Sequence, residues 1–144
     1  MRSILSAIAL TAASLVAPSA FAEDAAYAQA EASETRLAVV LSYADWCGSC
    51  RVIDPKLEAI RTDNAFDGVQ FVRLDYTERS DEAYFAAADA AGVGEAVRAK
   101  FDDQIKTGLV LLIDLDDASI TSELRRDHTE AQMIEAIESA AAEA

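Results

Sequence analysis

The only two cysteines of the chain, Cys47 and Cys50, are separated by two residues in the stretch YADWCGSCRVIDP, residues 43–55. Two thiols at this spacing can form a fixed disulfide, can contribute to a metal site, or can open and close as a redox centre. In a redox centre, one sulfur attacks a disulfide and the other resolves the mixed disulfide that results. The chemistry of this pair therefore depends on its compartment and on the elements that carry it.

A metal site and a purely structural bridge are both poor interpretations of this pair. A structural zinc ion normally needs four nitrogen or sulfur ligands, and beyond the cysteines the chain offers only His128. Structural disulfides are common in exported domains, but a bridge across two intervening residues closes a very small loop and constrains the unfolded chain little. We therefore expect no metal and no other cofactor, and we favour a redox-active pair.

The first 22 residues predict export. A short basic start at Met1–Ser3 precedes an apolar run, Ile4–Ala17, and Pro18 breaks this run before the sequence AFA. This is the three-part pattern of a secretory signal peptide with an A-x-A cleavage site, and the run is too short to cross a membrane as a mature helix. We expect residues 1–22 to be removed, residues 23–144 to form one domain, and the protein to be periplasmic or secreted.

The charge of the chain excludes some classes of partner. The formal net charge is −14, with 26 acidic and 12 basic residues. Nucleic acids and anionic lipids are bound through clustered Lys and Arg side chains, so neither is an expected partner. A high negative charge also keeps a protein soluble, and this simpler interpretation needs no acidic binding face.

The hydrophobic pattern predicts an α/β domain. The nearly continuous apolar run at 37–43 is typical of a strand that is covered on both faces. Further strands are predicted at 69–75, 108–114 and about 119–125. Two crossover connections between these strands predict helices on both faces of the sheet.

The helices are predicted from apolar spacing and from capping residues. A helix is expected from about Cys47 to Arg61, two helices between about 80 and 103 with a break near Gly92, and a last helix from Thr129. Another helix is expected at residues 23–36. The helical stretch near 81–103 either packs against the core, through apolar anchors, or forms a specificity element. The proposed anchors are Tyr84, Phe85, Val97 and Phe101.

The two cysteines are thus placed where the first strand passes into the following helix. Free N–H groups and the helix dipole favour an anion at a helix N-terminus, so a thiolate at Cys47 is stabilised there. The inner thiol, Cys50, is expected one turn further in and shielded by apolar residues. A C-x-x-C motif at such a junction is typical of redox proteins. Because the helix end stabilises the thiolate of Cys47 and apolar residues shield Cys50, we expect Cys47 to react first.

The stretch ADWCGSCRVIDP resembles the active-site motif of the thioredoxin family, and the resemblance extends over about 37–142. It is similar to that of exported thioredoxin-like proteins and of the C-terminal periplasmic domain of the membrane reductase DsbD. The resemblance implies a thioredoxin-like α/β fold with a central four-stranded mixed sheet and helices on both faces. It also implies a redox-active Cys47–Cys50 disulfide, with Cys47 as nucleophile, Cys50 as resolving thiol and Trp46 as a flat apolar surface for substrate.

The sequence departs from the family at two functional positions. The proline that usually faces the cysteines, in a cis peptide, is replaced by Gly108, or by Thr107 if the register slips by one, and both are substrate-binding candidates. The buried aspartate of the family, six residues before the first cysteine, is replaced by Leu41. We therefore take Asp54 as the candidate proton acceptor for Cys50 and Asp45 as the second candidate.

The resemblance implies a thiol–disulfide oxidoreductase that acts on protein thiols or disulfides. Gly48 and Ser49, between the cysteines, include neither the His nor the Pro that marks strongly oxidising members, which favours a reductase or isomerase. A reductase in an oxidising compartment needs an electron donor, for which a membrane thiol reductase is the expected partner. The alternative is a binding module with the same fold, in which the disulfide is not catalytic.

Overall fold

The computed structural model describes residues 35–144. The signal peptide predicted at residues 1–22 lies outside the described residues, and so does the helix predicted at 23–36, except for two non-helical residues at its end. Four strands form one sheet: β1 (Leu37–Tyr43), β2 (Val69–Asp75), β3 (Leu109–Asp114) and β4 (Ile120–Arg125). Four helices accompany them: α1 (Cys50–Asp63), α2 (Asp81–Ala90), α3 (Gly94–Lys100) and α4 (Glu130–Glu143).

The sheet is mixed, with the strand order β2-β1-β3-β4. β1 and β2 are parallel, whereas β3 pairs antiparallel with both β1 and β4. As a result, β1, β2 and β4 end at the same edge of the sheet, and β3 begins there. The loops that follow β1, β2 and β4 and the segment that precedes β3 therefore meet at one edge.

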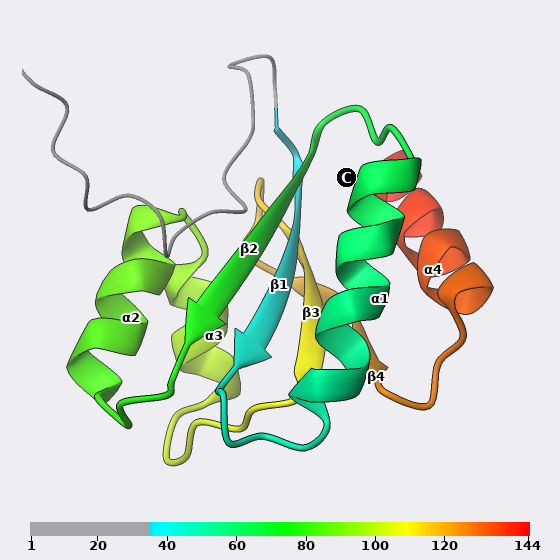
Figure 1. The fold of residues 1–144 in the computed structure, drawn as a ribbon. Coiled ribbons are helices and arrows are strands. Elements are labelled where there is room, and N and C mark those ends of the chain that lie inside the picture. The colour runs from blue at the N-terminus through cyan, green and yellow to red at the C-terminus, as the bar shows by residue number, and fades with distance from the viewer. Residues whose placement is uncertain (1–34) are drawn as a thin grey trace, which may run out of the picture.

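Helices cover both faces of the sheet, as predicted (Figure 1). Alternate residues of β1 point to opposite faces, so Leu37, Val39 and Leu41 pack with α1 and α4. Ala38 and Val40 pack in the second cluster, with residues of α2 and α3. The central strand is buried on both faces because of these two layers, which explains its continuous apolar sequence.

The first helix begins later than predicted. Its first residue is Cys50 rather than Cys47, and it continues to Asp63 with Ile53 and Leu57 buried on its inner face. Cys47 lies in the turn before it, with its carbonyl accepting a hydrogen bond from the N–H of Cys50 at 3.1 Å. The apolar spacing identified the helix, but it does not distinguish a preceding turn from the first helical turn.

The other helices follow the predicted pattern. The break between α2 and α3 includes Gly92, whose φ of +76° favours glycine. The last helix starts with the predicted capping box, since Thr129 and Gln132 each accept a hydrogen bond from the other's main-chain N–H. In the part of the chain that the structure describes, no helix is long and apolar enough to cross a membrane.

The packing interpretation of the 81–103 stretch is confirmed for most of its proposed anchors. Tyr84, Val97 and Phe101 are buried, and Phe85 is half-buried against the same cluster. Tyr84 makes edge-on ring contacts with Phe85 and Phe101, with centroids 5.7 and 6.2 Å apart. These residues attach α2 and α3 to one face of the sheet.

Candidate active site

Cys47 and Cys50 form a disulfide, with their Cα atoms 5.3 Å apart. The pair lies at the edge of the sheet where the loops converge. Cys47 keeps 7% of its surface exposed, whereas Cys50 is fully buried. The main-chain N–H of Cys50 donates a hydrogen bond to the Sγ atom of Cys47 at 3.2 Å. The outer sulfur therefore receives a donor from the helix start, although Cys47 itself precedes the helix.

Gly108 lies directly against this disulfide. Its N–H donates to the carbonyl of Ser42 at 2.8 Å, which extends the pairing of β3 with β1. A Cβ atom added to Gly108 would lie 3.0 Å from the Cys47 Sγ atom and 2.6 Å from the Cβ atom of Ser49. The backbone at Gly108 also has a φ of +83°. Of the two residues predicted to face the cysteines, Gly108 is thus the one in contact, and Thr107 lies beside it.

Trp46 forms the exposed surface beside the pair. Its side chain is 43% exposed, so it is not a core aromatic residue. The indole N–H donates to the main-chain oxygen of Thr77 at 3.1 Å, and the guanidinium carbon of Arg79 lies 4.4 Å from the ring centroid. Both partners belong to the loop after β2, which therefore holds the ring in place at the surface.

Comparisons with known proteins agree with this arrangement. The family model for thioredoxin matches residues 19–89, a range that contains both cysteines, β1, α1 and β2. The chain therefore contains a thioredoxin-family domain. The remaining strands complete its thioredoxin-like fold, a four-stranded mixed sheet with helices on both faces. A comparison with curated proteins gives no match.

Several solved structures are similar to this chain. Thioredoxin from Fasciola hepatica is 26% identical, with 72% of this chain and 80% of that chain covered and a TM-score of 0.46. Trxlp from Edwardsiella tarda is 14% identical, with coverages of 72% and 82% and a TM-score of 0.46. StoA from Bacillus subtilis is 13% identical, with coverages of 72% and 84% and a TM-score of 0.49.

The two departures from the thioredoxin family have distinct structural settings. No peptide bond within residues 35–144 is cis, so the segment before β3 passes the disulfide through Gly108 with trans bonds. Leu41 is buried between the sheet and α1. Asp54 lines the same small cavity as Leu41, and its Oδ2 atom lies 3.8 Å from the Nη1 atom of Arg73. The second candidate, Asp45, is exposed in the loop after β1.

A buried polar pair beneath the disulfide was missed by the sequence analysis. The hydroxyl of Tyr84 donates to the Oγ atom of Ser42 at 2.7 Å, and both residues are buried. Burial raises the pKa of Tyr84 to about 12, although its hydrogen bond to Ser42 acts in the opposite direction. The carbonyl of Ser42 lies 3.7 Å from the Cys50 Sγ atom, within reach of an S–H donor in the reduced protein.

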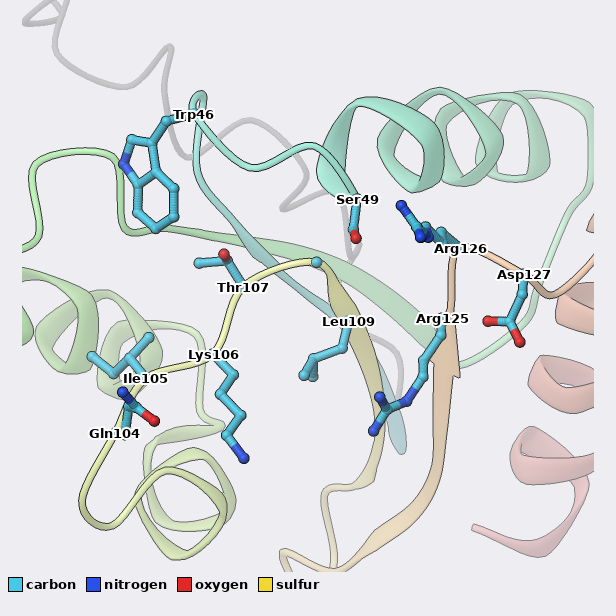
Figure 2. A pocket seen from close by; sticks show the side chains of 11 residues that line it. Trp46, Ser49, Gln104, Ile105, Lys106, Thr107, Leu109, Arg125, Arg126 and Asp127 are labelled. Atoms are coloured by element: carbon cyan, nitrogen blue, oxygen red, sulfur yellow. The ribbon is translucent and has the colours of Figure 1, made fainter.

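A groove beside the disulfide was also missed (Figure 2). Its lining comes from the loop after β1, the segment before β3, and the loop after β4. The lining residues are Trp46, Ser49, Gln104, Ile105, Lys106, Thr107, Gly108, Leu109, Arg125, Arg126 and Asp127. The adjacent pair Arg125–Arg126 is a signal that the sequence contained, because basic pairs are rare in so acidic a chain.

The arrangement suits sulfur chemistry better than metal chemistry. Among the described residues, no three His, Cys, Asp or Glu side chains are grouped so that they could hold a metal ion. The two sulfurs are bonded to each other, Cys47 keeps 7% of its surface exposed next to Gly108, and Cys50 is fully buried. Of the two cysteines, Cys47 is therefore the one closer to the surface.

Proposed function

We propose that this chain is an exported thiol–disulfide oxidoreductase that acts on protein substrates as a reductase or isomerase. The observation that carries the proposal is the asymmetry of the Cys47–Cys50 pair: Cys47 keeps 7% of its surface exposed next to residues that line a groove, and Cys50 is fully buried. Such an asymmetry gives the two sulfurs different roles in a two-step exchange. The thioredoxin-family domain supports the same class of chemistry.

In the reductase direction, the reaction starts from the dithiol form. The thiolate of Cys47 attacks one sulfur of the substrate disulfide, and the other substrate sulfur leaves as a thiolate. The thiolate of Cys50 then attacks the Cys47 sulfur, which releases the second substrate thiol and forms the Cys47–Cys50 disulfide. Two electrons pass from the protein to the substrate. Isomerisation uses the first step and its reversal, with no net electron transfer.

The Cys50 thiol must lose a proton before the second step. We propose Asp54 as the acceptor, because it is on the same helix one turn after Cys50 and shares a small cavity with Leu41, where the family carries its aspartate. Its Oδ2 atom also lies 3.8 Å from the Nη1 atom of Arg73. Asp45 is exposed, and its main-chain oxygen accepts a hydrogen bond from Arg51. We therefore assign Asp45 a role in the structure of the loop after β1 and not as the proton acceptor for Cys50.

Protein substrates are supported by the segment before β3. Within the described residues, no hydrogen bond engages the main chain of Thr107, which borders the groove next to Gly108. Free main-chain groups beside the reacting sulfur can pair with an extended peptide. The exposed face of Trp46 offers apolar surface to the same peptide.

Export and the electron donor complete the proposal. The apolar N-terminal segment, residues 4–17, supports secretion into an oxidising compartment. In such a compartment, the disulfide of a reductase must be reduced again by a thiol donor such as a membrane reductase. We expect the mature protein to begin at Glu23. Mass spectrometry of protein from the native host measures this directly, and an intact Met1 in the cytosolic fraction would contradict it.

An insulin-reduction assay tests the activity. We expect the wild-type protein to accelerate reduction in the presence of dithiothreitol and Cys47→Ser to give only the uncatalysed rate. Cys50→Ser should accumulate a mixed disulfide with the substrate, because the resolving thiol is absent. The replacement of the family's proline by Gly108 favours the alternative, a binding module with a non-catalytic disulfide. Equal rates for wild type and Cys47→Ser would support that alternative.

A further inference from the structure

The groove beside Cys47 is positively charged, although the chain as a whole is strongly acidic. It has a volume of about 930 Å³, and its lining includes Lys106, Arg125 and Arg126 but only one acidic residue, Asp127. The chain carries a formal net charge of −14. Three of its 12 basic residues therefore line the groove together with Trp46 and Gly108, the neighbours of the disulfide.

Two of the three cations are available to a ligand. Arg125 forms an ion pair with Glu123, which also binds Lys100 at 2.7 Å. The hydrogen bond from Lys100, reinforced by Arg125, holds the pKa of Glu123 below its usual range, so this carboxylate neutralises part of the Arg125 charge. By contrast, neither Lys106 nor Arg126 forms an ion pair anywhere in residues 35–144.

The main chain beneath these two cations is held in a fixed relation to the disulfide. Lys56 of α1 donates hydrogen bonds to the carbonyl of Arg126 at 2.9 Å and to that of His128 at 2.8 Å. Lys106 is two residues before Gly108, whose N–H is bonded to Ser42. In Figure 2, the guanidinium group of Arg126 points toward the side of Ser49, and Lys106 extends from the opposite wall of the groove. The two charges thus lie on different walls of the groove.

We infer that the preferred substrates are polypeptide disulfides with Asp or Glu side chains near the reacting cysteine, recognised by Lys106 and Arg126. The inference rests on the proposed function and specifies its substrate class. An extended chain advances about 3.3–3.6 Å per residue, so the residues next to a substrate cysteine lie along the groove that these two cations line. Opposite charges at a binding surface raise the association rate and suppress wrong partners.

A polypeptide fits the site better than a small acidic thiol does. The two cations are on separate segments on either side of the groove, so a ligand must extend across it to meet both. The unengaged main chain of Thr107, next to Lys106, borders the same groove and can pair with a peptide backbone. A substrate with acidic residues on both sides of its cysteine satisfies all three groups at once.

Three matched peptide disulfides test the inference. Each has a cysteine flanked on both sides by two Glu, two Gln or two Lys residues. The reduced protein, purified from its host as a full chain, is mixed with each peptide, and the fluorescence of Trp46, the only tryptophan, reports the exchange. We expect the Glu peptide to react roughly ten-fold faster than the Lys peptide at low salt, since each exposed ion pair contributes a factor of about two to five.

Salt and substitutions separate the two cations from the general charge of the protein. Screening at about 0.5 M salt should reduce the Glu-to-Lys rate ratio to within roughly two-fold. The double variant Lys106→Gln/Arg126→Gln should give the same loss of preference at low salt. Arg98→Gln is the matched control, because Arg98 pairs with Asp89 and contacts Phe85 on α2, away from the groove. This control should keep the wild-type ratio.

The outcomes distinguish this inference from the proposed function. Exchange at equal rates with the three peptides, or a preference that persists in the double variant, would overturn the inference and leave the oxidoreductase activity standing. Glutathione disulfide is a fourth substrate in the test. If it reacts faster than the Glu peptide, and if this rate depends on Lys106 and Arg126, the preferred substrate is a small acidic disulfide and the inference of a polypeptide substrate is overturned. Exchange with none of the disulfides, together with inactivity on insulin, would overturn the proposed function and the inference with it.

Discussion

Gly108 contacts the reactive end of the disulfide so closely that a Cβ atom at this position would lie 3.0 Å from the Cys47 Sγ atom. The same atom would be 2.6 Å from the Cβ atom of Ser49, a distance that requires one of the two segments to move. The left-handed backbone at Gly108 adds a second reason for glycine, because other residues adopt it at a cost. The approach between β3 and the disulfide thus depends on the absence of a side chain.

Substitution of Gly108 by Ala should therefore destabilise the protein and also slow exchange at Cys47. We expect a loss of about 1–2 kcal/mol in the free energy of unfolding from the positive φ, and about 1–3 kcal/mol more from the clash. Gly92→Ala is the matched control, since Gly92 has a φ of +76° but open space around its Cβ position. Urea unfolding and insulin reduction measure both effects. Equal losses in the two variants would show that the contact with Cys47 is unimportant.

In the reduced protein, iodoacetamide should label Cys47 before Cys50. Cys47 keeps 7% of its surface exposed and its sulfur accepts the N–H of Cys50, which favours the reactive thiolate, whereas Cys50 is fully buried. Peptide mapping after brief alkylation at neutral pH measures the order. Alkylation of the urea-unfolded protein is the control and should label both cysteines equally. Preferential labelling of Cys50 in the folded protein would reverse the assigned roles.

Asp54→Asn should slow the second step of exchange with little effect on the first. The amide keeps the shape of the side chain but cannot take a proton from Cys50 in the same way. Loss of general-base assistance should slow release of the mixed disulfide by roughly 10²-fold or more. Rapid quenching with acid resolves the formation of the mixed disulfide from its release. Asp63→Asn, at the exposed end of the same helix, should leave both steps unchanged. Unchanged release in Asp54→Asn would remove this residue from the mechanism.

The stability of the protein should fall at alkaline pH through Tyr84. Its pKa is raised from 10.0 to about 12 in the folded protein, so between these values the unfolded chain has lost a proton that the folded chain retains. The free energy of unfolding should then decrease by up to about 1.4 kcal/mol per pH unit, or about 2–3 kcal/mol in all. The stability from this group is complete below pH 10 and is lost as pH rises through 12.

Tyr84→Phe isolates this contribution. At neutral pH, the variant should lose about 1 kcal/mol, because the hydrogen bond to the buried Ser42 hydroxyl is removed. Above pH 10 the difference from wild type should shrink and then change sign, since only the wild type loses about 2–3 kcal/mol through ionisation of the phenol. Urea unfolding of both proteins at several pH values measures the difference. A constant difference across this range would contradict the role of Tyr84.

The sequence was sufficient to predict the elements and the family. The apolar run of β1, the spacing of Ile53 and Leu57 and the capping box at Thr129 are local patterns, and each is confirmed in the structure. The C-x-x-C motif at a strand-to-helix junction indicated the reactive pair. The exact start of α1 was wrong by three residues, because apolar spacing does not distinguish Cys47 in a turn from Cys47 in a helix.

The tertiary structure decided which distant segments meet at the disulfide. Antiparallel pairing of β3 with β1 brings Gly108, rather than Thr107, against Cys47. The order β2-β1-β3-β4 also brings Thr77 to Trp46 and Arg126 to the groove. Local side-chain patterns specify whether a segment becomes a helix or a strand, whereas strand order and register depend on long-range pairing. The Cys47–Cys50 pair could therefore be predicted from the sequence. The segments that surround it could not, because they are brought to the disulfide only by the pairing of the four strands.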